Sequence, residues 1–267
     1  MSGGDFLSRP KSGAIKIIHE PSAAEPFVVL EKSPGLPSAP LVPGDESALT
    51  ECGRLFPKVL SVRGKKSVEG GLVHRIDTGT SGLLLIAQSQ EFYEHILAAQ
   101  AKDLFIKGYR AESDIDQKNA EKLGGFPKSG FTFPLPQKLS ALRGFSLESC
   151  FRPFGKGKKE VRPVLQSSNA AALKKMSGDK IYSTTLVAAK QCGGGALLEC
   201  KITQGYRHQV RAHLAWLGLP VKGDALYNAD FRMARERGAA DMEMRFKAVS
   251  LEFPDFFSDK VYRFSLD

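Results

Sequence analysis

The apolar residues of this chain are gathered in short runs that have the length and composition of β-strands. The clearest, LLLIA at 83–87, is continuous, which predicts a strand buried on both faces. Similar runs occur at 15–18, 27–30, 104–111, 181–188, 196–203, 245–253 and 260–266. Helical spacing is found at 46–56, 91–102, 170–176 and 206–217. Because strands dominate and hairpin-length links join them, the pattern favours a mixed α+β fold over a regular βαβ winding.

The length of 267 residues allows one large domain or two smaller ones. We interpret 15–267 as a single domain preceded by a flexible tail at 1–14, which lacks the apolar core of a secretory signal. Glycine and proline are frequent from 113 to 163, where periodicity is poor and basic residues crowd toward the end. We interpret 113–163 as an insertion or flap whose hairpins close against a ligand.

The chain carries 38 Lys and Arg against 29 Asp and Glu, a formal net charge of +9. This surplus predicts attraction to a polyanion, such as nucleic acid, an anionic membrane or a phosphorylated substrate. The fractions of hydrophobic (42%) and charged (25%) residues exclude wholesale disorder. No stretch approaches the ~18 apolar residues of a membrane span, so we expect no membrane partner.

The four cysteines, Cys52, Cys150, Cys192 and Cys200, include no C-x-x-C pair. Their spacing suggests neither a zinc site nor a disulfide framework. We therefore interpret them as reduced thiols and expect a cytoplasmic protein.

The first segment with candidate chemistry is 73–82, VHRIDTGTSG, directly before the 83–87 run. Polar side chains are dense here, and Gly79 and Gly82 let the backbone approach a ligand closely. An alternative interpretation is an Asx-type turn in which the Asp77 carboxylate caps nearby amides. A phosphate-binding P-loop is a poor alternative because no lysine follows Gly82.

The second segment is 204–214, QGYRHQVRAHL, at the junction of a strand and a helix. A cation in the first turn of a helix opposes the helix dipole, so Arg207 and His208 would need a nearby carboxylate or phosphate. A solvated basic helix start is the alternative. His208 and His213 would point about 140° apart on a helix, whereas a zinc-binding helix needs histidines three or four positions apart. We expect no metal.

The third segment is the strand at 104–111, where Lys107 and Tyr109 share one face. A core tyrosine is the ordinary interpretation of Tyr109. A lysine on the same face argues against a dry core and predicts a polar cleft beside it.

Together these segments resemble the RluA-type pseudouridine synthase family. The family patterns H-R-[LI]-D-x-x-T-S-G-[LV]-L and K-x-Y-x-A are similar to 74–84 and 107–111, respectively. The pattern H-Q-I-R-x-H-L, followed by G-x-P-[IV]-x-G-D-x-x-Y, is similar to 208–227. The loop at 32–37, KSPGLP, also looks like the family's K-P-x-G-L. Since the motifs occur in the family's order, the resemblance is specific.

The resemblance implies a mixed, mostly antiparallel central sheet with flanking helices and a central active-site cleft. It also implies an isomerase that detaches uracil from C1′ of a uridine in RNA, rotates it and rejoins it through C5. Asp77 would be the catalytic aspartate, attacking either C1′ of the sugar or C6 of the base. Tyr109 would pack against the base, and Arg211 would pair with Asp77 and keep it ionised. No cofactor is expected.

The resemblance further implies that the target uridine is flipped out of stacked RNA. The other motif residues are expected to contact the RNA: His74, Arg75, Thr78, Thr80, Ser81, Lys107, Arg207, His208 and Gln209. The basic stretch 152–162 is a candidate flap that would hold the RNA backbone in a salt-dependent way. Many relatives carry an S4 RNA-binding module, but only about 14 residues precede the first predicted strand, so we expect none here.

The sequence departs from the family pattern near both motifs. Thr78 stands where many members have an arginine that can fill the space of the flipped base, and Gly79 replaces a common acidic residue. GYR at 205–207 replaces the usual G-R-x. The choice between ribosomal and transfer RNA, and the target uridine, stay open. We expect a monomer. The alternatives are a non-catalytic RNA-binding protein on the same fold, and a metal-dependent phosphoesterase built on His74, Asp77, His208 and His213.

Overall fold

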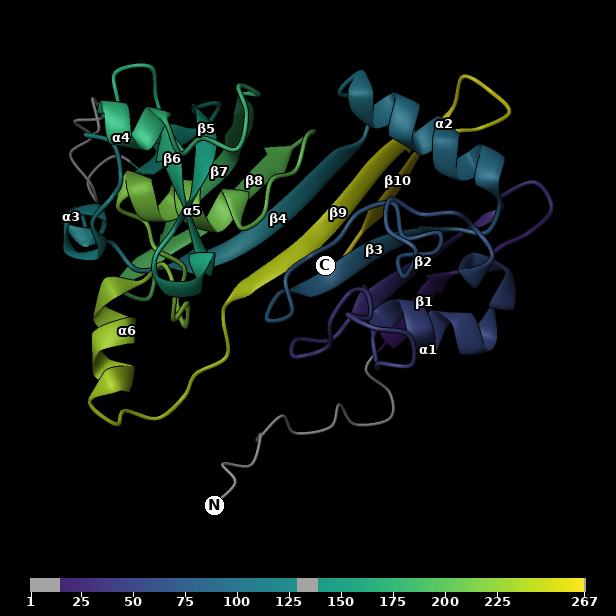
Figure 1. Ribbon diagram of the computed structural model, residues 1–267, viewed down its shortest axis with the longest axis horizontal. Coiled ribbons are helices and arrows are strands. Elements are labelled where there is room, and N and C mark those ends of the chain that lie inside the picture. The colour runs from purple at the N-terminus through teal and green to yellow at the C-terminus, as the bar shows by residue number, and fades with distance from the viewer. Residues whose placement is uncertain (1–14, 129–138, 267) are drawn as a thin grey trace. The chain divides into compact units, whose positions relative to one another are not determined.

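The computed structural model describes residues 15–128 and 139–266 (Figure 1). The predicted tail at 1–14 lies outside the described residues, as does part of the predicted insertion at 113–163. The chain divides into two compact units, with the boundary between Leu97 and Ala98. Each helix among the described residues is too short or too polar to span a lipid bilayer.

The first unit contains an antiparallel arrangement in which β1 (Ile15–His19) pairs with β2 (Phe27–Lys32) and β2 pairs with β3 (Ser81–Ala87). Strand β3 contains the LLLIA run, whose five residues are all fully buried, as predicted. The strand pairing places Lys32, the last residue of β2, opposite Gly82. The end of β2 and the start of β3 therefore lie side by side.

The helices of the first unit are α1 (Ala48–Leu55), the 3₁₀ turn η1 (Pro57–Leu60) and most of α2 (Gln90–Ala101), which crosses the boundary. Helix α1 begins two residues later than predicted because Ser47 caps it. The Ser47 side chain accepts a hydrogen bond from the Thr50 amide, and the Thr50 side chain accepts one from the Ser47 amide.

The second unit contains the remaining strands in the order β10-β9-β4-β8-β7-β5-β6, and all their pairings are antiparallel. The strands are β4 (Ile106–Ser113), β5 (Ser146–Phe154), β6 (Glu160–Val164), β7 (Tyr182–Cys192), β8 (Gly195–Ile202), β9 (Phe246–Pro254) and β10 (Val261–Ser265). The helices are α3 (Asn119–Leu123), η2 (Leu139–Leu142), η3 (Lys156–Lys158), α4 (Ala170–Leu173), α5 (Gln209–Leu217) and α6 (Ala229–Glu236). The predicted α+β fold with mostly antiparallel strands is confirmed.

Part of the predicted insertion is a regular hairpin, in which β5 pairs with β6 and also with β7. The described part of this segment thus contains the hairpin of β5 and β6. Its movement as a flap stays a prediction.

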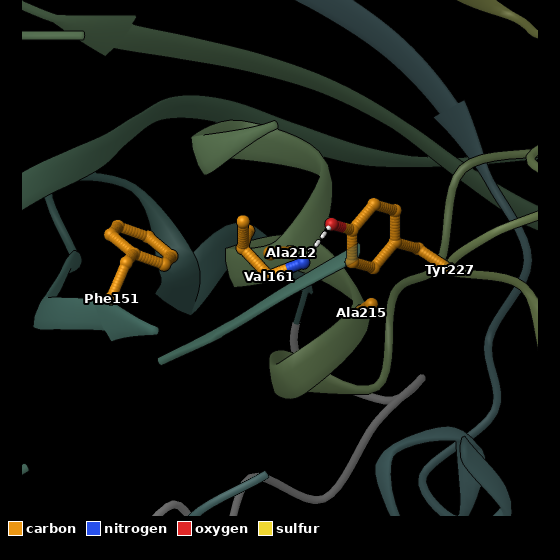
Figure 2. Close-up of a cluster of buried hydrophobic side chains, with 5 residues drawn as sticks. All are labelled: Phe151, Val161, Ala212, Ala215 and Tyr227. Atoms are coloured by element: carbon orange, nitrogen blue, oxygen red, sulfur yellow. Dashed lines mark hydrogen bonds between the residues drawn. The ribbon is translucent and has the colours of Figure 1, made fainter. Parts of the chain in front are cut away.

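Helix α5 packs against β6 and β7 (Figure 1). Figure 2 shows a core cluster that joins it to the hairpin: Phe151, Val161, Ala212, Ala215 and Tyr227. The Tyr227 hydroxyl accepts a hydrogen bond from the Val161 amide at 2.8 Å. All nine residues of α5 are buried, so the hairpin and this tyrosine fix the helix that carries Arg211.

The predicted helix is present and ends at Leu217 as expected, but α5 begins at Gln209, three residues later than predicted. His208 adopts a left-handed backbone conformation with φ 57°, which a right-handed helix cannot include. Arg207 and His208 therefore precede the first helical turn, and the predicted conflict with the helix dipole does not arise there.

Candidate active site

Asp77 lies in the loop that leads into β3, where its side chain is partly exposed. Its backbone carbonyl accepts a hydrogen bond from the Thr80 amide at 2.9 Å, which closes a turn. Thr78 in that turn is exposed, whereas Thr80 is buried and its hydroxyl has no hydrogen-bond partner among the described residues. Ser81 begins β3.

The residues before Asp77 are fixed by the first unit itself. His74 Nε2 accepts a hydrogen bond from the Leu85 amide at 3.2 Å. Arg75 forms an ion pair with the buried Glu69 at 2.9 Å, while its own side chain stays 56% exposed. One nitrogen of the Arg75 guanidinium is therefore held by Glu69, while much of the side chain is accessible to solvent.

A buried lysine lies beside the aspartate loop. The Lys32 ammonium donates hydrogen bonds to the backbone carbonyls of Leu36 (2.7 Å), Ser33 (3.0 Å) and Thr78 (3.2 Å). Burial lowers the pKa of Lys32 to about 8, although the negative charge of Asp77 acts in the opposite direction. At neutral pH the ammonium is therefore still largely charged.

In the second unit, Arg211 donates two hydrogen bonds to the carboxylate of Asp224, from Nε at 2.7 Å and from a terminal nitrogen at 2.8 Å. The guanidinium also lies 5.1 Å from the centre of the Tyr227 ring. Burial tends to raise the pKa of Asp224, but Arg211 and the amides of Leu226 and Tyr227 outweigh it and lower that pKa overall. The carboxylate expected beside this helix is thus supplied by the G-D-x-x-Y part of the same motif. The predicted pairing of Arg211 with Asp77 stays a prediction.

Tyr109 and Lys107 lie on β4 and are both buried. The Tyr109 ring stacks on Phe246, with centroids 5.2 Å apart and an interplanar angle of 8°. Lys107 donates a hydrogen bond to the Thr203 carbonyl at 2.7 Å and lies over the Phe105 ring. Burial lowers the pKa of Lys107 to about 7.

Arg207 and His208 connect the motif to its neighbours. Arg207 is exposed, and its guanidinium donates to the carbonyls of Lys158 at 2.6 Å and Glu160 at 3.2 Å. His208 Nδ1 shares a hydrogen bond with the Tyr227 hydroxyl at 3.0 Å. Arg207 thereby ties the strand–helix junction to the β5–β6 hairpin.

Gln209 and His213 use their polar atoms inside the protein. Gln209 donates to the Ser183 carbonyl at 2.9 Å and accepts from the Tyr206 amide at 2.9 Å. Both ring nitrogens of His213 are hydrogen bonded, to the hydroxyls of Ser149 and Thr184. Burial lowers the pKa of His213 to about 3, so the ring is neutral.

The described residues include no group of three or more His, Cys, Asp or Glu side chains that could hold a metal ion. His213, one of the four residues of the phosphoesterase alternative, has both of its possible ligand atoms engaged by hydroxyls. The geometry therefore offers no support to that alternative.

The basic stretch 152–162 divides into two parts. Arg162 is fully buried, pairs with Glu160 at 2.6 Å and lies over the rings of Phe126 and Phe154. The expectation that it contacts RNA is wrong, because the guanidinium is a structural part of the second unit. Three lysines of the hairpin turn stay exposed: Lys156, Lys158 and Lys159.

Residues 26–216 match the family model described as RNA pseudouridylate synthase. The chain belongs to this family. It is 28% identical over 176 residues to "RNA pseudouridine synthase 2, chloroplastic" of Arabidopsis thaliana, a match that covers 63% of this chain and 33% of that protein. It is 26% identical over 160 residues to "Ribosomal large subunit pseudouridine synthase D" of Zymomonas mobilis, covering 59% of this chain and 39% of the relative. The chain thus spans less than half the length of both relatives.

A solved structure agrees on the fold of this pseudouridylate synthase family member. "Human RNA Pseudouridylate Synthase Domain Containing 1" matches with a TM-score of 0.59 at 17% identity, covering all of this chain and 86% of the human one.

Several residues that hold the motif side chains or backbone in this family member were not predicted from the sequence. Asp224 and Tyr227 stand in the quoted 208–227 motif, but no role was assigned to them. Lys32 begins the quoted KSPGLP loop, so the signal was present there as well. Glu69 lies outside the motifs, and no pattern in the sequence indicated its ion pair with Arg75.

Proposed function

We propose that this protein isomerises a uridine in ribosomal or transfer RNA to pseudouridine. The observation that carries the proposal is the family match over residues 26–216, which includes an intact HRID motif with Asp77 in a partly exposed loop. RNA also fits the net charge of +9, because a basic protein attracts the phosphate backbone.

Asp77 is proposed as the catalytic aspartate, attacking C1′ of the sugar or C6 of the base. The bond between N1 and C1′ breaks, a bond between C5 and C1′ forms, the bond that Asp77 made in its attack breaks again, the proton leaves C5 and N1 gains one. All atoms are conserved, so neither a redox partner nor water is consumed. We propose that Tyr109 packs against the base and that Arg211 pairs with Asp77 in the working enzyme.

We propose that the RNA is held by the exposed cations and by the polar groups of the Asp77 loop. Arg75, Arg207 and the turn lysines Lys158 and Lys159 present charges to solvent that could meet phosphates. The protein would work as a monomer in the cytoplasm without a metal or cofactor.

The test is conversion of uridine to pseudouridine in total cellular RNA by the purified protein, mapped by mass spectrometry. Wild-type protein should modify a defined position. Asp77→Asn should abolish conversion, since the nucleophile is lost. Asp259→Asn, at an exposed position, is the matched control and should leave the rate unchanged.

If the wild-type protein binds RNA but converts no uridine, the proposed enzyme activity is wrong, and the protein is a non-catalytic RNA-binding protein on the same fold. Conversion by Asp77→Asn at the wild-type rate would contradict the role of Asp77. Inhibition by EDTA would revive the metal-dependent alternative.

A further inference from the structure

We propose that the segment Lys32 to Ser38 is a positioning clamp that holds the peptide groups on both sides of Asp77. Lys32 and Ser38 are its positioning residues, and neither belongs to the motif that carries the aspartate. The inference rests on the proposed function and assigns to it two residues that act through Asp77.

Ser38 holds the residue before the aspartate. Its hydroxyl donates a hydrogen bond to the Ile76 carbonyl at 2.7 Å and accepts one from the Ile76 amide at 3.1 Å. Ser38 is only 4% exposed, so water does not compete freely for these bonds. Both backbone groups of Ile76 are therefore fixed by one side chain from a distant part of the sequence.

Lys32 and Gly35 hold the residue after the aspartate. The Thr78 carbonyl accepts hydrogen bonds from the Gly35 amide at 2.8 Å and from the Lys32 ammonium at 3.2 Å. The same ammonium also donates hydrogen bonds to the carbonyls of Ser33 and Leu36. It therefore fixes the conformation of the clamp segment as well as its contact with Thr78. Gly35 has φ 85°, in the left-handed region that favours glycine.

The ammonium has a second effect because it carries charge. Lys32 is fully buried and interacts electrostatically with Asp77, with no hydrogen-bonded carboxylate of its own among the described residues. The attraction between this buried cation and the Asp77 carboxylate adds to the hydrogen bonds of the clamp. The clamp thus sets the position of Asp77 and the potential around it.

Positioning of this kind matters to the rate more than to binding. A misplacement of about 1 Å in a reacting group can cost about 100-fold in rate. RNA affinity depends instead on many phosphate contacts spread over the surface. Loosening the clamp should therefore slow the chemical step and leave the RNA dissociation constant unchanged.

The test compares Ser38→Ala, which removes both hydrogen bonds to Ile76, with Ser38→Thr, which keeps the hydroxyl. Ser61→Ala, at an exposed serine of the same unit, is the matched control. The single-turnover rate of pseudouridine formation should fall about 10- to 100-fold in Ser38→Ala, with RNA affinity unchanged. Ser38→Thr should recover most of the rate, and Ser61→Ala should match wild type.

Lys32→Met should show the larger loss of rate, because it removes three hydrogen bonds and the charge. Should Lys32→Met fail to fold, which a thermal melt would show, Ser38→Ala decides the question. Wild-type rates in Ser38→Ala, or equal losses of rate and RNA affinity, would overturn the clamp.

Amide hydrogen exchange separates this inference from the proposed function, because it does not require turnover. The peptide spanning 74–80 should exchange faster in Ser38→Ala than in wild type or Ser61→Ala. Unchanged protection would overturn the clamp even if the enzyme is active. Lack of conversion by the wild-type protein would overturn the proposed function, and the exchange measurement would still decide the clamp.

Discussion

Lys32 in the first unit and Arg211 in the second are both buried cations, and they are stabilised in different ways. Lys32 in the first unit is fully buried and donates to three backbone carbonyls. Arg211 in the second unit is 6% exposed and donates two hydrogen bonds to the carboxylate of Asp224. One cation is thus held by dipoles and the other by an opposite charge.

The difference follows from the chemistry of the two side chains. A lysine can lose its proton, so a site of neutral carbonyls is tolerable, and burial lowers the pKa of Lys32 to about 8. A guanidinium stays protonated in proteins, so a buried arginine needs a counter-ion. Asp224 meets that need and is itself held by two backbone amides. Lys32 can therefore become neutral by losing a proton, whereas Arg211 stays charged.

The largest effect is expected on the free energy of unfolding, when the counter-ion of Arg211 is removed. Asp224→Asn should lower the free energy of unfolding by about 3 kcal/mol or more, because it breaks a buried ion pair. Urea denaturation at neutral pH measures this change. Asp230→Asn is the control, since its exposed pair with Lys122 should contribute about 1 kcal/mol or less. Equal losses in the two variants would show that Arg211 does not depend on Asp224.

The second-largest effect is expected when the arginine is replaced by a lysine. Arg211→Lys keeps a positive charge but loses the planar fork that binds Asp224 through two nitrogens. Turnover should fall about 100-fold while RNA affinity changes little, as measured by single-turnover kinetics and filter binding. Equal loss of both would make Arg211 a phosphate contact alone.

The smallest effect is a pH dependence that only the lysine site should show. The pKa of Lys32 is about 8 in the folded protein and near 10.5 in the unfolded chain. Between these values the unfolded state binds more protons, so this group makes the folded state more stable as pH rises. From about pH 7 to about pH 9, wild type should gain about 1 kcal/mol relative to Lys32→Met.

Urea denaturation of both proteins at the two pH values provides the measurement. Lys16→Met is the control, because Lys16 is exposed and should give curves parallel to wild type. Parallel curves for Lys32→Met would mean that Lys32 titrates in the folded protein as it does in the unfolded chain.

Much of the fold was predictable because it depends on local patterns. The 83–87 run forms the last five residues of β3, the runs at 15–18 and 27–30 lie within β1 and β2, and the run at 196–203 overlaps β8 except for its last residue. Helix α6 was not predicted. It begins after the Asn228 cap, and among its eight residues, ADFRMARE, only Ala229 is buried, so little of its apolar surface joins the core.

The sequence alone determined the order of the strands along the chain, the motif around Asp77 and the family resemblance that the match over 26–216 confirms. Only the tertiary structure decided which partners the charged groups take. Arg162 became a buried structural residue, and Ser38 met Ile76 across 38 positions of sequence. Even the start of α5 depends on its surroundings, where His208 bonds to Tyr227. Local patterns encode periodicity and turns, whereas a buried hydrogen bond or ion pair forms only when folding brings distant groups together and removes water from both.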